Sequence, residues 1–240
     1  MPRTVVALAA LTVAAAAVAA PTSLTAQVTA GSTLTFTGTT SATDVGGDGV
    51  RLDFAKHVLA DPSANTGSFA PLNKEHGISN GSIESLVVGS GLQPINRVVH
   101  FGPYRFDLER LPSGAYGQAD CYVMPAPGQR CTPYQLPSYE LSPFYLENVA
   151  GSDGMFTALI SFDVAGTVTA RGISSPFTGT ITARFDGLSY QEALAGLEQF
   201  GMKDVPFTAT FTVGGASARV PAAALAPAAA AASVVPEPSS

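Results

Sequence analysis

Residues 206–213 read Pro-Phe-Thr-Ala-Thr-Phe-Thr-Val, a strict alternation of threonine with apolar side chains. A period of two places successive side chains on opposite faces of a β-strand, so that one face is buried and the other is wet. Threonine suits the wet face because it is polar and also β-branched. This stretch therefore predicts a half-buried strand.

The same alternation recurs along the chain. It is seen in these sets of apolar residues: Leu34 and Phe36; Val50, Leu52 and Phe54; Val168 and Ala170; Ile181, Ala183 and Phe185. Two apolar runs, 86–88 and 156–164, predict strands that are buried on both faces. Glycine-rich turns separate the runs. Such a pattern is typical of an antiparallel sandwich or barrel, and we expect an all-β, antiparallel β-sandwich (jelly-roll-like or similar) over residues 27–220.

One short helix is expected at 189–200. Ser189 and Glu192 have the spacing of a capping box, and Gly201 is placed to end the helix with a left-handed residue. Apolar side chains follow at helical spacing: Tyr190, Leu194 and Leu197. We expect this stripe to pack on the core and to cover an open end or edge of the sandwich, in preference to forming a groove for a partner.

Residues 1–26 have the layout of a secretory signal peptide. Arg3 precedes an apolar run at 5–20, and small and polar residues follow. We expect cleavage between Ala26 and Gln27, because a cut after Ala20 would place a proline next to it. A transmembrane anchor is the alternative, but the run is short and rich in alanine. The chain is therefore expected to use the Sec export machinery and to work outside the cell or on its outer surface.

The chain has two cysteines, Cys121 and Cys131, with nine residues between them. In an exported chain such a pair predicts a disulfide. A redox-active pair is disfavoured because the CxxC spacing is missing.

The end of the chain differs in composition from its body. Residues 221–234 form a linker of mostly proline and alanine, and 235–240 are rich in proline and serine. The last segment resembles the Val-Pro-Glu-Pro-Ser core of the PEP-CTERM sorting signal, through these residues: Val235, Pro236, Glu237, Pro238 and Ser239. That family comprises exported bacterial proteins, typical of Gram-negative species that make exopolysaccharide. In the family a transmembrane helix and an arginine cluster follow the motif, so exosortase is expected as a partner only if the chain extends past Ser240.

Few residues in the sequence are candidates for metal binding, ligand binding or catalysis. Asp44, Asp48 and Asp53 resemble part of a calcium loop, although a hairpin turn explains them more simply. A possible ligand patch for a glycan or a protein contains Tyr134, Tyr139 and Tyr145, because tyrosine combines an apolar ring with a polar tip. Ser79 lies in a G-x-S-x-G match, but the strand-to-helix context of a nucleophile elbow is missing. We expect no cofactor and no catalytic residue.

A formal net charge of −6 argues against nucleic acid as a partner. We expect an exported, non-enzymatic cell-surface or extracellular-matrix protein. The resemblance implies an association with exopolysaccharide, biofilm or other surface components. The first alternative is a lectin-like module that binds glycan or another ligand, and the second is a secreted hydrolase that depends on Ser79.

Overall fold

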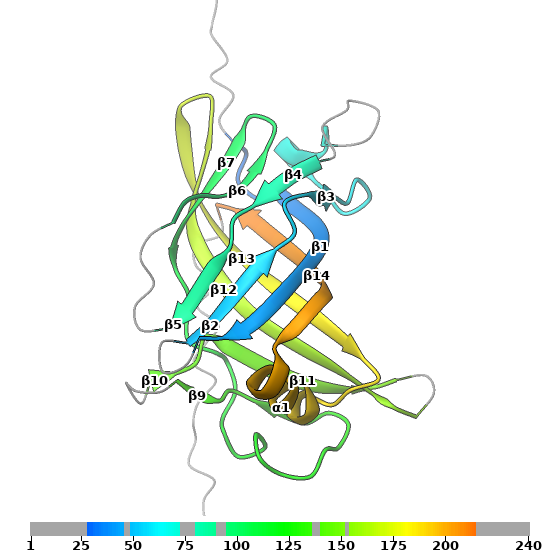
Figure 1. Cartoon of the computed structure of the whole chain (residues 1–240). Coiled ribbons are helices and arrows are strands. Elements are labelled where there is room, and N and C mark those ends of the chain that lie inside the picture. Colours follow the sequence, from blue (N-terminus) through cyan, green and yellow to red (C-terminus); the bar gives the residue numbers. More distant parts are fainter. Residues whose placement is uncertain are drawn as a thin grey trace, which may run out of the picture.

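The computed structural model describes residues 28–45, 49–72, 80–89, 95–135, 140–151 and 154–214, and most of its elements are strands (Figure 1). All strand pairings among these residues are antiparallel. In chain order the elements are β1 (Thr33–Asp44), β2 (Gly49–Phe54), β3 (Val58–Ala60), the 3₁₀ turn η2 (Gly67–Phe69), β4 (Asn80–Ile83), β5 (Leu86–Gly89), β6 (Ile95–Phe101), β7 (Tyr104–Arg110), β8 (Arg130–Cys131), β9 (Tyr134–Gln135), β10 (Glu140–Leu141), β11 (Phe144–Ala150), β12 (Phe156–Ala170), β13 (Ile173–Asp186), α1 (Tyr190–Phe200) and β14 (Met202–Val213).

Eight strands form a closed ring, in the order β13-β14-β1-β3-β4-β6-β7-β12, because β12 also pairs with β13. The all-β class is confirmed, but the expected sandwich is wrong, since the strands close into a barrel. Alternation tells which face of a strand is buried, and it does not tell which strand is the neighbour. Closure of the ring depends on which strands are neighbours. A closed ring has no edge strands, whereas each sheet of a sandwich has two.

Two long strands change partners part of the way along. β1 pairs with β3 at residues 36–37 and with β2 at 40–44. β12 pairs with β7 at 165–170 and with β11 at 156–162. At one end, which we call the closed half, β3, β4, β6 and β7 complete the ring. At the other, the open half, β2–β5 and β11–β8 form two separate flaps that no strand pairing joins within the described residues (Figure 1).

Aromatic side chains fill the closed half. The ring centroid of Phe211 lies 5.2 Å from that of Phe36, 5.3 Å from Phe106 and 5.0 Å from Phe177. A Cβ atom at Gly179 would collide with the Phe211 ring, so glycine is required at that position of β13. Side chains of this size suffice to fill the interior of an eight-stranded barrel.

The alternation of 206–213 is confirmed, because Phe207, Ala209, Phe211 and Val213 are buried and the threonines between them point outward. The prediction for 86–88 is wrong. Val87 is 50% exposed, because side chains alternate along a strand and that of Val87 points to the outer, solvent-facing side of β5, whereas Leu86 and Val88 are buried.

Helix α1 crosses the end of the open half (Figure 1). The predicted capping box is present: the Ser189 hydroxyl accepts from the Glu192 N–H, and the Glu192 carboxylate accepts from the Ser189 N–H at 2.8 Å. Gly201 has the predicted positive φ, 69°, but its ψ of 174° turns the chain directly into β14. No helix in the described part of the chain is long and apolar enough to cross a membrane.

Candidate functional site

The open half encloses an apolar cavity of about 520 Å³. Its walls come from β1, β2, β5, β11, β12, β13, β14 and α1. The aromatic lining residues are Phe54, Phe144, Phe162, Phe185 and Phe207, and the aliphatic ones include Leu52, Val88, Leu146, Ile160 and Ile181. Ligand pockets usually measure ~300–1,000 Å³ and are mostly apolar, so both the volume and the lining fit a small ligand.

The cavity lies between two hydrophobic clusters. One cluster fills the closed half and extends to Phe162 and Ile181, and the other lies under α1 and includes Leu146 and Ala193. Phe144 packs against both clusters. The cavity is therefore a gap in the core of the molecule. It opens where β1 and β12 change partners and the walls of the barrel diverge.

Small inward side chains leave part of this space empty. Ala42 on β1, Ala183 on β13 and Ala193 on α1 all line the cavity. A larger apolar residue at any of these positions would project into the cavity. Alanines are too common in this sequence for these three to have been singled out before the fold was known.

Hydrogen bonds anchor the first turn of α1. Tyr190 is fully buried; its hydroxyl donates to the carbonyl of Asp120 at 2.6 Å, and its N–H donates to Oδ1 of Asn148 at 2.8 Å. Asn148, on β11, is also fully buried and donates through Nδ2 to Gln191 at 3.0 Å. Because the first turn is held in place, Leu194 and Leu197 in the next turns reach the cavity.

The disulfide between Cys121 and Cys131 is confirmed, with the two Cα atoms 5.2 Å apart. Both cysteines are buried in the cluster under α1. The disulfide therefore holds the loop whose Asp120 carbonyl accepts the hydrogen bond from Tyr190. This cross-link and the anchored helix support the same side of the cavity.

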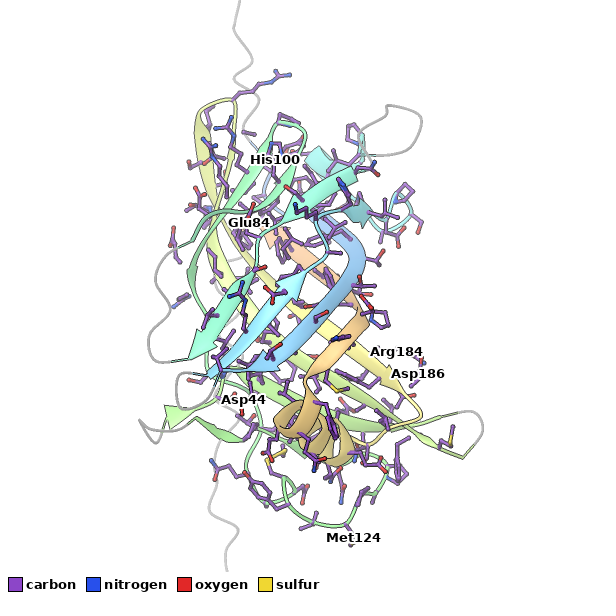
Figure 2. All side chains as sticks on the ribbon, viewed as in Figure 1. Asp44, Glu84, His100, Met124, Arg184 and Asp186 are labelled. Carbon is purple, nitrogen blue, oxygen red and sulfur yellow. A yellow bond between two sulfur atoms is a disulfide. The ribbon has the colours of Figure 1, made fainter. Side chains whose placement is uncertain are left out.

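The charged residues that line the cavity are both acidic. Asp44 ends β1, and Glu198 lies in the last turn of α1; both are exposed at the rim. Figure 2 shows Asp44 at the end of the barrel that α1 covers. The lining contains no Lys, Arg or His within the described residues. Neutral hydroxyls at Thr40 and Ser142 are the other polar side chains of the lining.

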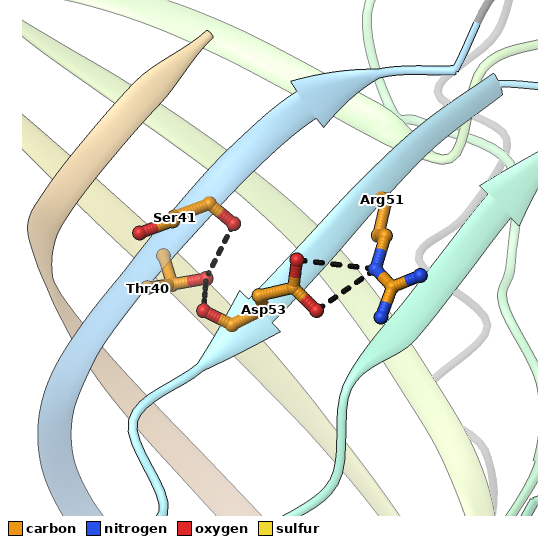
Figure 3. Close-up of polar contacts among 4 residues, drawn as sticks. All are labelled: Thr40, Ser41, Arg51 and Asp53. Carbon is orange, nitrogen blue, oxygen red and sulfur yellow. Dashed lines mark hydrogen bonds and ion pairs between the residues drawn. The ribbon is translucent and has the colours of Figure 1, made fainter.

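The structure describes two of the three candidate calcium ligands, Asp44 and Asp53, and places them at different positions along the β1–β2 ladder. Asp44 pairs with Val50 in the β1–β2 ladder, whereas Asp53 pairs with Ser41, and Asp48 lies outside the described residues. Both carboxylate oxygens of Asp53 accept from Nε of Arg51, at 2.9 and 3.1 Å (Figure 3), and this hydrogen bond lowers the pKa of Asp53. No group of three metal-binding side chains exists within the described ranges, and the calcium loop stays a prediction.

Two of the three candidate tyrosines lie within the described residues, on different strands. Tyr134 belongs to the short strand β9, Tyr139 lies outside the described residues, and Tyr145 lies on β11. The hydroxyl of Tyr145 donates to Oδ1 of Asp163 at 3.0 Å; burial and this nearby carboxylate raise the pKa of Tyr145 well above its usual value. Its aromatic neighbour is Tyr116, with ring centroids 5.6 Å apart, a residue that the predicted patch did not include.

Other predicted sites lie outside the described residues: the cleavage site at Ala26 and Gln27, the sorting motif at Val235–Ser239, and Ser79. A second hollow, of about 490 Å³, lies on the outer face of the barrel and is lined by threonines of β1, β13 and β14 together with His57 and Arg184. It is more open to solvent than the cavity, so we regard the cavity as the better candidate site.

Comparisons of this chain with protein-family models, curated proteins and solved structures find no match.

Proposed function

We propose that this is an exported, non-enzymatic binding protein that holds one small apolar ligand in the mouth of its barrel. The observation that carries the proposal is the cavity of about 520 Å³ between two packed clusters. Protein interiors are close-packed, and an unfilled cavity costs ~24 cal/mol per Å³. A closed void of this volume would cost on the order of 10 kcal/mol, as much as a whole domain's stability. The open rim reduces that cost, and an apolar ligand would offset much of the remainder.

The proposed setting is the cell surface or the extracellular matrix, in association with exopolysaccharide. Its support is the signal-peptide layout of residues 1–26 and the resemblance of Val235–Ser239 to the PEP-CTERM motif. A buried disulfide suits an oxidising compartment, which agrees with export.

Titration with N-phenylnaphthylamine, a neutral fluorophore that brightens in apolar surroundings, tests the proposal. We expect saturable binding of one fluorophore per chain. Ala183→Phe places a ring in the cavity and should abolish binding. Arg184→Phe is the matched control: it adds the same ring at the next residue of β13, which is exposed on the opposite face, and should leave binding intact.

Two results would contradict the proposal: no saturable signal with the unaltered chain, or equal binding by both variants. Circular dichroism shows whether each variant is folded. If Ala183→Phe does not fold, Ala42→Phe fills the cavity from β1, with the exposed Thr43→Phe as its control.

A second candidate is glycan binding on the outer face, for which the paired tyrosines are the specific observation. The guanidinium of Arg130 lies 5.5 Å from the centre of the Tyr116 ring and is ion-paired with Glu147 at 2.8 Å. Tyr145 pairs with Ser161 across the β11–β12 ladder, and its hydroxyl donates to Asp163 at 3.0 Å. Tyr116→Ala should weaken retention on immobilised exopolysaccharide, whereas Ala183→Phe should not. Equal retention by both variants would remove this candidate.

A further inference from the structure

The three large apolar side chains with the greatest exposure in the described part of the chain belong to α1 and the loop beside it. Tyr122 is 84% exposed, Met124 85% and Phe200 83%. Tyr122 and Met124 lie in the loop that the disulfide closes, and Phe200 lies in the last turn of α1. Figure 2 shows Met124 in the part of this loop that extends past α1, at the same end of the barrel as Asp44. Apolar surface is therefore concentrated outside the cavity at the end of the open half.

The disulfide and several hydrogen bonds hold this loop in place. The side chain of Gln129 spans the loop: it accepts from the Ala126 N–H at 2.8 Å and donates to the Met124 carbonyl at 2.8 Å. The side chain of Gln191, in the first turn of α1, donates to the Val123 carbonyl at 3.2 Å. A loop that is already ordered loses little conformational entropy when its side chains are covered by a partner.

The chemistry of this surface favours a lipid bilayer over a protein partner. Residues 121–129 contain no charged side chain. Tyrosine is enriched where a membrane meets water, because its ring is apolar and its hydroxyl is polar. Two aromatic side chains and one methionine expose on the order of 500 Å², less than the ~800 Å² per partner of a standard protein–protein interface.

We infer that residues 121–129 and Phe200 dock the open half on the surface of a lipid bilayer. This inference rests on the proposed function, because an apolar ligand partitions into lipid and docking brings the cavity to the phase that holds the ligand. The apolar side chains enter the interfacial layer of the bilayer. The chain has a net charge of −6 and gains nothing from an anionic surface, so zwitterionic lipid suffices.

Single-tryptophan variants test the inference, because the chain contains no tryptophan of its own. Met124→Trp places the reporter in the loop. Leu59→Trp is the matched control, at an exposed apolar position on β3 in the closed half. With phosphatidylcholine vesicles, the emission of Met124→Trp should shift to shorter wavelength and be quenched by brominated lipid, whereas Leu59→Trp should show neither change. The absence of a shift in Met124→Trp, or equal shifts in both variants, would overturn the inference.

Flotation with the same vesicles measures how much the exposed side chains contribute. Tyr122→Ser with Met124→Ser should lower the partition coefficient at least ~10-fold, because two apolar side chains are no longer buried in lipid. The control, Leu59→Ser with Val87→Ser, removes two exposed apolar side chains from strands of the wall and should leave the coefficient unchanged. Circular dichroism shows whether each variant is folded. If the loop variant does not fold, Phe200→Ser is compared with Leu59→Ser instead.

The proposed function and the docking inference fail separately. Absence of N-phenylnaphthylamine binding contradicts the proposed function. If the fluorophore binds normally and the chain does not float with phosphatidylcholine vesicles, only the docking inference is overturned. It is also overturned if flotation requires phosphatidylglycerol, which would indicate electrostatic attraction. A folded loop variant that changes the sedimentation coefficient of the chain and not its partitioning overturns it too, because the surface would then join two copies of the chain.

Discussion

The closed half and the open half are built from the same kinds of residues, but their interiors differ. In the closed half, Phe211 packs against three other phenylalanine rings, with centroids 5.0 to 5.3 Å away. In the open half, Phe162 packs against Phe144 at 5.5 Å, belongs to the edge of the larger hydrophobic cluster and also borders the cavity. Both phenylalanines are inward-facing and buried. The difference arises because β1 and β12 have partners that complete the ring in one half and splay apart in the other.

This contrast separates two uses of an apolar side chain. Where strands close around it, a phenylalanine contributes packing that stabilises the fold. Where the strands diverge, the same residue presents apolar surface that a ligand can cover. Three predictions test the contrast, from the largest expected effect to the smallest.

Phe211→Ala should lower the free energy of unfolding by ~3–5 kcal/mol, because it leaves a void among tightly packed rings. Phe162→Ala should cost less, ~2 kcal/mol, since the residue already borders empty space and mainly its transfer free energy is lost. Urea unfolding of both variants in the absence of ligand measures the difference. Equal losses would mean that the open half is packed as tightly as the closed half.

Reduction of the Cys121–Cys131 disulfide should cost roughly 2–3 kcal/mol, the chain-entropy value for a short loop. We expect the loss to concentrate in the open half, where the disulfide holds the loop that anchors α1. Hydrogen exchange with and without dithiothreitol would locate it. Amides of β6 and β7 should keep their protection, and a uniform loss across the barrel would contradict this assignment.

Ser189→Ala removes the helix cap in the open half and should cost ~1 kcal/mol at neutral pH. Hydrogen bonds from the backbone and hydroxyl of Ser189 lower the pKa of Glu192. The ionised Glu192 carboxylate therefore contributes its full share of the free energy of unfolding above the ordinary pKa of a glutamate, ~4.3. That share is lost as the pH falls through the lowered pKa of Glu192 in the folded chain. Urea unfolding between pH 7 and pH 3 measures the free energy of unfolding of both chains. The difference between the variant and the unaltered chain should become smaller in acid.

The control for the cap is Ser113→Ala, at an exposed serine outside the helix, which should change stability little at any of these pH values. If the difference in free energy of unfolding between Ser189→Ala and the unaltered chain stayed constant down to pH 3, the ionised Glu192 carboxylate would not contribute to the stability of the cap.

Local elements were largely predictable from the sequence. The alternation of Phe207, Ala209 and Phe211 with threonines predicted β14 because side-chain direction in a strand depends only on position along the chain. Ser189 and Glu192 predicted the start of α1 because a capping box involves residues three apart. The disulfide was predictable because the chain has only two cysteines.

The candidate site was not predictable in the same way. The tyrosine patch was sought among residues 134–145, yet the aromatic neighbour of Tyr145 is Tyr116, which precedes that segment in the chain. The cavity draws on residues from Thr40 to Phe207, so no window of the sequence contains it. The run 86–88 was assigned to the wrong environment because an apolar run does not reveal that one face of its strand lies in solvent.

By itself, the sequence determined the strands with a clear alternation, such as β13 and β14, the helix with its cap, the cross-link and the acidic charge of the chain, because each follows from residues that are close together or few in number. The tertiary structure alone decided that the strands close into a ring and that β1 and β12 change partners. It thereby decided where the core is interrupted by a cavity with an acidic rim. The physical reason is that pairing between distant strands depends on register and closure, which no local pattern encodes.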